Sequence, residues 1–116
     1  MNFEDYIYQL KTNWKEKLSE NEWFFSDFRE NLISKLSQND AFNAIPVLIN
    51  FLLKENEVDL FSEEMELLNS LVRKANTTEV PENLIENLDK LNILTEKDSY
   101  MNRIWNDIKD YYYISS

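Results

Sequence analysis

Residues 40–75 read DAFNAIPVLINFLLKENEVDLFSEEMELLNSLVRKA. The first part, AFNAIPVLINFLL (41–53), is apolar nearly all round, which is typical of a helix buried on most sides. After the acidic connection KENEVD (54–59), apolar residues recur at helical spacing and form one stripe: Leu60, Phe61, Leu67, Leu68, Leu71 and Val72. The stretch therefore predicts two packed helices, and the second begins either near Val58 or at Ser62.

Pro46 conflicts with this pattern. Inside a helix, proline removes a backbone hydrogen bond and bends the axis, at a cost of about 3 kcal/mol when nothing compensates. Either the first helix begins late, near Asn43, or it is bent at Pro46 for a packing reason.

Helical periodicity continues on both sides of this pair. Upstream, the capping-box pattern SENE (19–22) separates two apolar stripes, and ND (39–40) offers the start of the third helix. Downstream, a short helix is followed by the capping pattern TEKD (95–98) and a last helix. The stripes consist of Phe3, Ile7, Leu10, Trp14 and Leu18; Phe25, Phe28, Leu32 and Leu36; Leu84, Leu88 and Leu91; and Met101, Ile104, Trp105, Ile108 and Tyr112.

No segment alternates with the period of a strand, so we expect an all-α fold. About six antiparallel helices with short connections should form one helical domain over residues 1–116. The chain has no glycine, and asparagine falls near the predicted helix boundaries, where it can cap a start or adopt the left-handed conformation at a stop. The asparagines in question are Asn21, Asn39, Asn56, Asn76 and Asn92.

The residue types that are missing argue against several kinds of site. Without cysteine or histidine, there is no thiol nucleophile, no thiolate metal site and no imidazole base or ligand. Without glycine, the usual phosphate-binding loops and nucleophile elbows cannot form. No spacing of carboxylates nominates a hydrolytic pair. We therefore expect no enzymatic activity, no metal site and no cofactor.

The chain is strongly acidic, with 12 Lys and Arg against 22 Asp and Glu and a net charge of −10. A field of this sign repels phosphate backbones and anionic lipids, so we expect no direct binding to nucleic acid or to a membrane surface. It either attracts a basic partner or serves solubility alone. The first residues, MNFEDYIYQLK (1–11), are acidic and amphipathic, unlike a signal peptide, and a cytoplasmic protein is expected.

Residues 40–75 resemble one HEAT-type repeat, in which an aspartate, a helix such as AIPVLINFLL (44–53), an acidic turn and a second amphipathic helix follow one another. The first helix of such repeats often carries an interior proline, which would explain Pro46. The resemblance implies a HEAT-like right-handed stack of antiparallel helix pairs, although the flanking segments 2–37 and 82–113 do not repeat the pattern closely. A plain helical bundle is the alternative.

The continuation VRKANTTEVPENL (72–84) is similar to a segment of small bacterial immunity proteins of polymorphic-toxin systems. This resemblance implies an antidote that neutralises a cognate toxin by stoichiometric protein–protein binding. Because an acidic inhibitor complements a basic nuclease, we expect a basic, nuclease-like toxin. The alternative is a non-catalytic helical scaffold or adaptor, and the choice between monomer and homodimer stays open.

Two acidic ridges are candidates for the surface that binds the partner. One lies on the helix after residue 57 and the other leads into the helix after Pro81, although a solvated helix face would give the same pattern. At the end of the chain, Tyr112 continues an apolar stripe and leaves two neighbouring tyrosines to reach solvent or a partner. The predicted partner-binding residues are Asp59, Glu63, Glu66, Glu79, Glu82, Glu86, Tyr111 and Tyr113.

Trp23 is a further candidate. In EWFFSDF (22–28), Phe25 and Phe28 share one helix face, so Trp23 points toward the polar side. It either closes over a neighbouring helix or stands exposed as an interface anchor, since Trp, Tyr and Arg dominate binding hot spots.

Overall fold

The computed structural model describes residues 2–114. Over this range the chain is all-α, as predicted, and contains no strand. It forms eight helices where the sequence predicts about six, because two of the predicted helices are each divided in two. The helices are α1 (Phe3–Lys11), α2 (Trp14–Glu20), α3 (Phe24–Lys35), α4 (Gln38–Lys54), α5 (Val58–Ala75), α6 (Glu82–Glu86), α7 (Leu88–Glu96) and α8 (Ser99–Tyr111).

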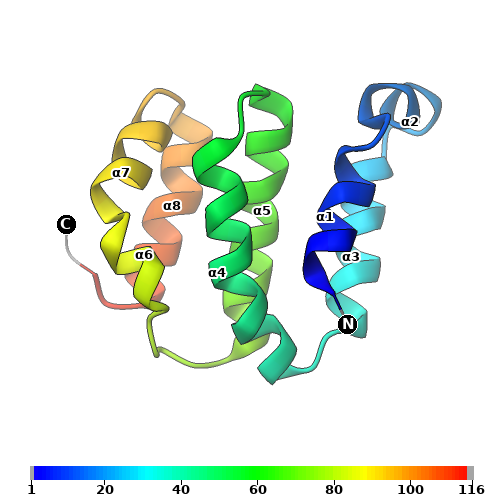
Figure 1. Cartoon of the computed structure of the whole chain (residues 1–116). Coiled ribbons are helices and arrows are strands. Elements are labelled where there is room, and N and C mark those ends of the chain that lie inside the picture. The colour runs from blue at the N-terminus through cyan, green and yellow to red at the C-terminus, as the bar shows by residue number, and fades with distance from the viewer. Residues whose placement is uncertain (1, 115–116) are drawn as a thin grey trace.

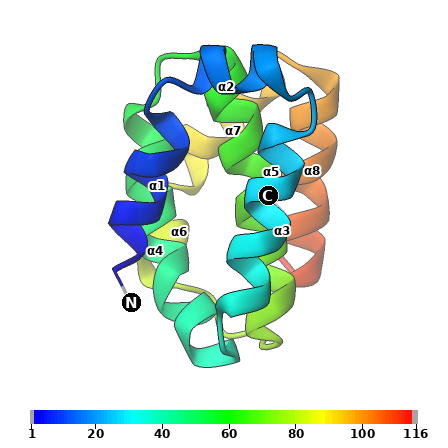
Figure 2. The ribbon, with the colours of Figure 1, turned by 90° about the vertical axis from the view of Figure 1, so that its right-hand side faces the viewer.

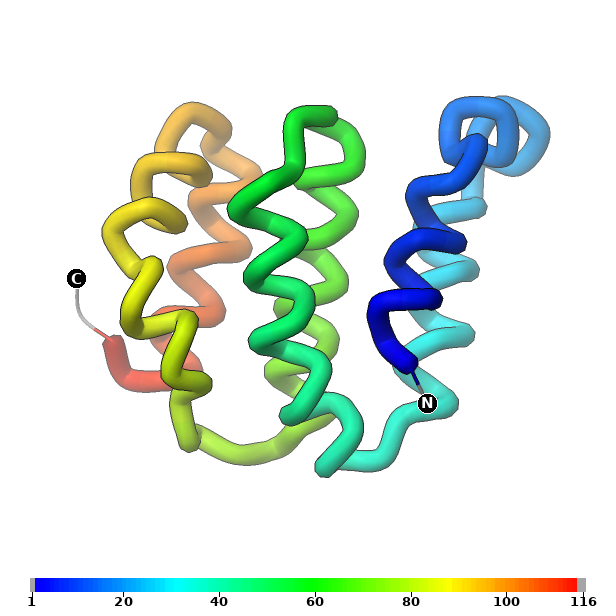
Figure 3. Tube along the Cα trace, in the orientation of Figure 1, coloured from blue at the N-terminus to red at the C-terminus, as the bar shows by residue number. Residues whose placement is uncertain are grey.

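The helices are arranged as three antiparallel pairs that stand side by side (Figure 1). The pair α1–α3 lies at one end, α4–α5 in the middle, and α6–α7 with α8 at the other end, as the chain trace in Figure 3 also shows. Figure 2 separates two faces, with α1, α4 and α6 on one and α3, α5 and α8 on the other. We call the second of these the α3–α5–α8 face. The molecule measures 41 × 33 × 20 Å.

The apolar stripes of the sequence form the core between these layers. The middle pair supplies much of it, including the fully buried Leu48, Met65 and Leu68. Trp105 of α8 is also fully buried, and its Nε1 donates to Asn92 Oδ1 at 2.6 Å. The predicted stripe of the last helix is confirmed, since all of its members are buried: Met101, Ile104, Trp105, Ile108 and Tyr112.

The first predicted helix is broken after Lys11. Asn13 adopts the left-handed conformation (φ 55°, ψ 34°), a geometry that asparagine tolerates better than most residues. As a result Trp14 starts a new helix and is only partly buried. The SENE capping box at residues 19–22 is wrong, because Ser19 lies inside α2; instead, Asn21 Oδ1 accepts from the backbone N–H of Trp23 at 3.0 Å.

The helix that contains Pro46 begins at Gln38, next to the start predicted at residues 39–40. Ser37 caps α4, with its Oγ accepting from the backbone N–H of Asp40 at 3.0 Å and the Asp40 carboxylate accepting from the N–H of Ser37. Of the two alternatives for Pro46, the late start near Asn43 is therefore wrong, and Pro46 lies inside the helix. The Pro46 carbonyl accepts a hydrogen bond from Asn83 Nδ2 at 2.8 Å, which ties α4 to α6.

The remaining boundaries follow the sequence in part. Of the two predicted starts for α5, the one near Val58 is confirmed, and Asn76 ends the helix with φ 54°. The TEKD capping pattern at residues 95–98 is confirmed only in part: Thr95 lies inside α7, and Asp98 caps α8, with its Oδ1 accepting from the N–H groups of Tyr100 and Met101. Asn39 lies in the first turn of α4, near the predicted boundary, whereas Asn92 lies in the middle of α7 and is not a boundary residue. A second break, at Asn87, divides α6 from α7.

None of the helices between residues 2 and 114 combines the length and the apolar character that crossing a bilayer requires.

Candidate functional site

The first predicted acidic ridge lies on the first turns of α5, but it is not a solvated ridge. Asp59 is exposed and Glu66 is partly buried, whereas Glu63 is only 5 % exposed. Arg29 of α3 covers Glu63, and its Nη1 lies 2.5 Å from Glu63 Oε1. The prediction of Glu63 as an exposed residue is thus wrong, because α3 packs against this side of α5.

The same residues line a cleft of about 410 Å³ on the α3–α5–α8 face. Four carboxylates, three aromatic side chains, two serines and one guanidinium group surround it. We call it the acidic cleft. Its lining residues are Glu22, Asp59, Glu63 and Glu66; Trp23, Phe25 and Tyr100; Ser26 and Ser62; and Arg29.

Among the carboxylates of the cleft, Glu63 has a strongly raised pKa. Burial raises its pKa to about 7, the charge and hydrogen bond of Arg29 act in the opposite direction, and the charge of Glu66 adds to the rise. Arg29 engages Oε1, while Oε2 is buried and has no hydrogen-bond donor among the described residues. A buried carboxylate oxygen without a donor favours any ligand that supplies one.

Two aromatic side chains stand at the mouth of the cleft. Trp23 is 64 % exposed, which agrees with the exposed alternative and not with closure over a neighbouring helix. Tyr100, at the start of α8, is 53 % exposed and its hydroxyl donates to Glu66 Oε1. This hydrogen bond is the main reason why the pKa of Tyr100 is raised. The cleft therefore combines negative charge with exposed aromatic surface.

The second predicted ridge lies elsewhere. Glu79, Glu82 and Glu86 are exposed and rim a groove of about 550 Å³ whose other lining includes Phe42 and Pro46 of α4. This groove is built on α4 and α6, the helices of the opposite face (Figure 2). The structure does not bring the two acidic ridges together.

The predicted tyrosines also lie away from the cleft. Tyr111 is partly buried, with Arg73 5.0 Å from its ring centroid and the Tyr112 ring packed edge-on at 5.6 Å. Tyr113 follows α8 in a left-handed conformation (φ 60°) and is 86 % exposed. Tyr100 and Tyr111 stand at opposite ends of α8, about 16 Å apart along its axis at 1.5 Å per residue.

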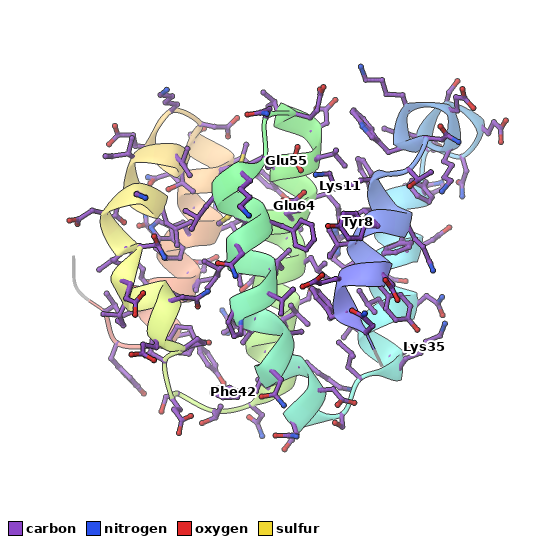
Figure 4. All side chains as sticks on the ribbon, viewed as in Figure 1. Tyr8, Lys11, Lys35, Phe42, Glu55 and Glu64 are labelled. Carbon is purple, nitrogen blue, oxygen red and sulfur yellow. The ribbon has the colours of Figure 1, made fainter. Side chains whose placement is uncertain are left out.

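A buried charged cluster was missed by the sequence analysis. Lys11 of α1, Glu55 at the C-cap of α4 and Glu64 of α5 meet where α1 packs against the α4–α5 pair (Figure 4). Lys11 Nζ lies 3.2 Å from Glu55 Oε1, and Glu64 is fully buried. Burial, together with the hydrogen bond to Glu55 and the Glu55 charge, raises the pKa of Glu64 to about 9. For Glu55, burial is outweighed by hydrogen bonds from Glu64, the Glu57 backbone and Lys11, so its pKa is lowered.

Glu64 is fully buried and the Glu55 side chain is 3 % exposed, so this cluster has a structural role in the core, and the acidic cleft is the better candidate site. The described residues contain no grouping of three or more Asp or Glu side chains that could hold a metal ion. What the cleft can do chemically is accept hydrogen bonds and positive charge while offering aromatic surface. Comparison with protein-family models, with curated proteins and with solved structures finds no match for this chain.

Proposed function

We propose that this chain is an immunity protein that binds and neutralises a cognate basic, nuclease-like bacterial toxin in the cytoplasm. Neutralisation is stoichiometric: the protein covers the surface with which the toxin binds its own substrate, and it needs no chemistry of its own. The observation that carries the proposal is the acidic cleft, in which Asp59, Glu63 and Glu66 meet the exposed rings of Trp23 and Tyr100.

The composition of the cleft suits a protein partner more than a small molecule. Tryptophan and tyrosine are enriched among interface hot spots, and negative charge around them speeds the encounter with a basic surface. At a net charge of −10, the whole molecule adds to that attraction. In this proposal, the three helix pairs form a HEAT-like right-handed stack, and the α3–α5–α8 face is its binding side.

Capture of a partner from the native strain tests the proposal. The immobilised wild-type protein should retain a basic protein at 1:1 stoichiometry and inhibit its toxic activity. The triple variant Glu22→Lys/Asp59→Lys/Glu66→Lys should lose both, because it reverses exposed and partly exposed charges while leaving the buried Glu63 in place.

The matched comparison is Glu79→Lys/Glu82→Lys/Glu86→Lys, which makes the same charge change on the opposite face. Binding that survives the cleft variant and is lost in the groove variant would move the proposed surface to α4 and α6. If neither variant changes capture of the toxin, the electrostatic basis of the proposal fails.

One observation supports the second candidate function, a homodimeric scaffold. Ile85 of α6 and Ile93 and Leu94 of α7 are exposed in the pair that α6–α7 forms with α8. Light scattering coupled to size-exclusion chromatography separates the two proposals. A dimer that Ile93→Lys converts to a monomer would favour the scaffold, and a wild-type monomer would oppose it.

A further inference from the structure

One carboxylate oxygen of a residue that lines the acidic cleft lacks a hydrogen-bond partner among the described residues. Glu63 is more than nine-tenths buried and lines the cleft, yet its Oε2 has no hydrogen-bond donor among the described residues. A buried carboxylate oxygen that has no hydrogen-bond donor costs more free energy than a buried neutral group without one. This observation is independent of the number of acids around the cleft, and it points to a ligand with N–H groups.

No cation among residues 2–114 donates to this oxygen. Arg29 donates to Oε1 of Glu63 and lies on the α3 side. Arg103 lies near enough to Tyr100 to oppose the rise of its pKa, but it is exposed and is not among the residues that line the cleft. With four carboxylates against one lining guanidinium, the cleft keeps an excess of negative charge.

We propose that the acidic cleft receives one arginine side chain of a protein partner, with the guanidinium group donating to Glu63 Oε2 and its plane stacked on the ring of Trp23. This inference rests on the proposed function only for the source of that arginine, which is a residue of the toxin.

Arginine fits the cleft better than lysine for two reasons. A guanidinium group has five N–H donors in one plane, so it can serve Glu63 and a second carboxylate, such as that of Glu66, at the same time. The plane also stacks on aromatic faces, and tryptophan gives the strongest such contact. A lysine ammonium group keeps the charge but loses the planar fork and the stacking.

Binding of a short peptide probe tests the inference without the toxin. The probes are the capped tripeptides acetyl-Ala-Arg-Ala-amide and its lysine and citrulline counterparts. Citrulline has nearly the shape of arginine without the charge. The readout is the indole N–H signal of Trp23 in ¹H–¹⁵N spectra, which Trp23→Phe assigns among the three tryptophans of the chain.

The arginine peptide should shift the Trp23 signal saturably, the lysine peptide should bind at least about threefold more weakly, and the citrulline peptide should not saturate. Glu63→Gln replaces Oε2 or Oε1 with an amide donor and should weaken arginine binding about tenfold. Glu86→Gln is the matched control, because it removes one carboxylate from α6 outside the cleft, and it should bind as wild type does.

The signal of the buried Trp105 reports whether Glu63→Gln is folded, and Glu66→Gln provides a second variant if it is not. Equal binding of the arginine and citrulline peptides, or no shift of the Trp23 signal with the arginine peptide, would overturn the inference. Unchanged arginine binding in the folded Glu63→Gln and Glu66→Gln variants would also do so.

The two proposals fail separately. If the arginine peptide binds but no toxin is captured, the arginine site stands and the proposed function falls. If the cleft variant abolishes toxin capture but the arginine peptide does not bind, the proposed function stands and the arginine site falls.

Discussion

Glu64 is buried beside Glu55, so two carboxyl groups share one site in the core with the ammonium group of Lys11. As a carboxylate, Glu64 would have no donor for either oxygen; as a carboxylic acid, it donates to Glu55. The raised pKa of Glu64, about 9, follows from its burial first and from Glu55 second. A bound proton is therefore part of the interface between α1 and the α4–α5 pair.

The stability of the protein should fall as the pH rises across the range in which Glu64 keeps this proton. In the unfolded chain, Glu64 ionises near its ordinary pKa of 4.5, whereas in the folded protein its pKa is about 9. Its contribution is complete below pH 4.5 and is lost as the pH rises to about 9, by up to about 1.4 kcal/mol per pH unit. Glu64→Gln keeps a donor toward Glu55 and should match wild type near pH 5 but exceed its free energy of unfolding at pH 8.

Urea unfolding at intervals between pH 5 and pH 9 measures both free energies. Because the net charge of the chain also grows with pH, Glu86→Gln serves as the control, since it removes an exposed carboxylate without touching the core. Identical pH profiles for Glu64→Gln and Glu86→Gln would show that the buried proton does not stabilise the fold.

The burial of Glu64 could have been predicted from the sequence. Leu60, Glu64 and Leu68 are spaced at i, i+4 and i+8, so Glu64 occupies a core position on the apolar stripe. Its partners could not be predicted in the same way. Lys11 and Glu55 come from other segments of the chain and reach Glu64 only because α1 packs against the middle pair.

The acidic cleft could not be predicted from the sequence either, because it depends on which helices pack together. Periodicity placed Asp59, Glu63 and Glu66 on one side of α5, and the aromatic residues around Trp23 left open whether its ring is exposed or closes over a neighbouring helix. Neither pattern says that α3 and α8 flank that side of α5, which is what buries Glu63 and brings Tyr100 to Glu66. Helix faces follow from spacing along one segment, whereas the neighbours of a face follow from the packing of several segments.

Helix boundaries were predicted less well than helix faces, and the reason lies in asparagine. Asn13 and Asn76 both adopt the left-handed conformation, and one divides a predicted helix while the other ends one. Asn92, which was also predicted at a boundary, lies in the middle of α7. Asparagine permits the left-handed conformation without requiring it, so packing decides where the chain turns.

Asn76 should therefore be sensitive to a side chain that disfavours positive φ. Asn76→Ala should lower the free energy of unfolding by about 1 kcal/mol, because a left-handed backbone is costly for alanine, whereas Asn76→Gly should stay within about 0.5 kcal/mol of wild type. Thermal unfolding measures this as a change of several degrees in the midpoint. Asn56→Ala, in a loop outside the left-handed region, is the control; an equal loss there would remove the conformational explanation.

Arginine binding in the acidic cleft should strengthen as the pH rises through about 7. The groups around Glu63 are Arg29 from α3, Glu66 from its own helix and Tyr100 from α8, with Glu22 and Asp59 also lining the cleft. Burial raises the pKa of Glu63 to about 7, so at pH 6 only about a tenth of it is ionised in the free protein. Because a guanidinium group binds the ionised form, affinity should rise about tenfold between pH 6 and pH 8.

Titration of the arginine peptide at pH 6, 7 and 8, followed by the Trp23 indole signal, checks this dependence. Glu63→Gln removes the titrating group and should give a weak affinity that does not change with pH. A wild-type affinity that is constant over this range, or a Glu63→Gln variant that retains the wild-type profile, would contradict the role given to Glu63.

The acids and the aromatic ring of the cleft should act on different rate constants of toxin binding. Asp59 is exposed at the rim, so Asp59→Lys should slow association and reduce its dependence on salt, with a smaller effect on dissociation. Trp23→Ala removes an anchor that the partner would bury and should speed dissociation by tenfold or more, with little change in association. Surface plasmon resonance at two salt concentrations separates the two effects. Tyr113→Ala is the matched aromatic control at the far end of α8; if it speeds dissociation as much as Trp23→Ala does, the C-terminal tyrosines and not the cleft anchor the partner.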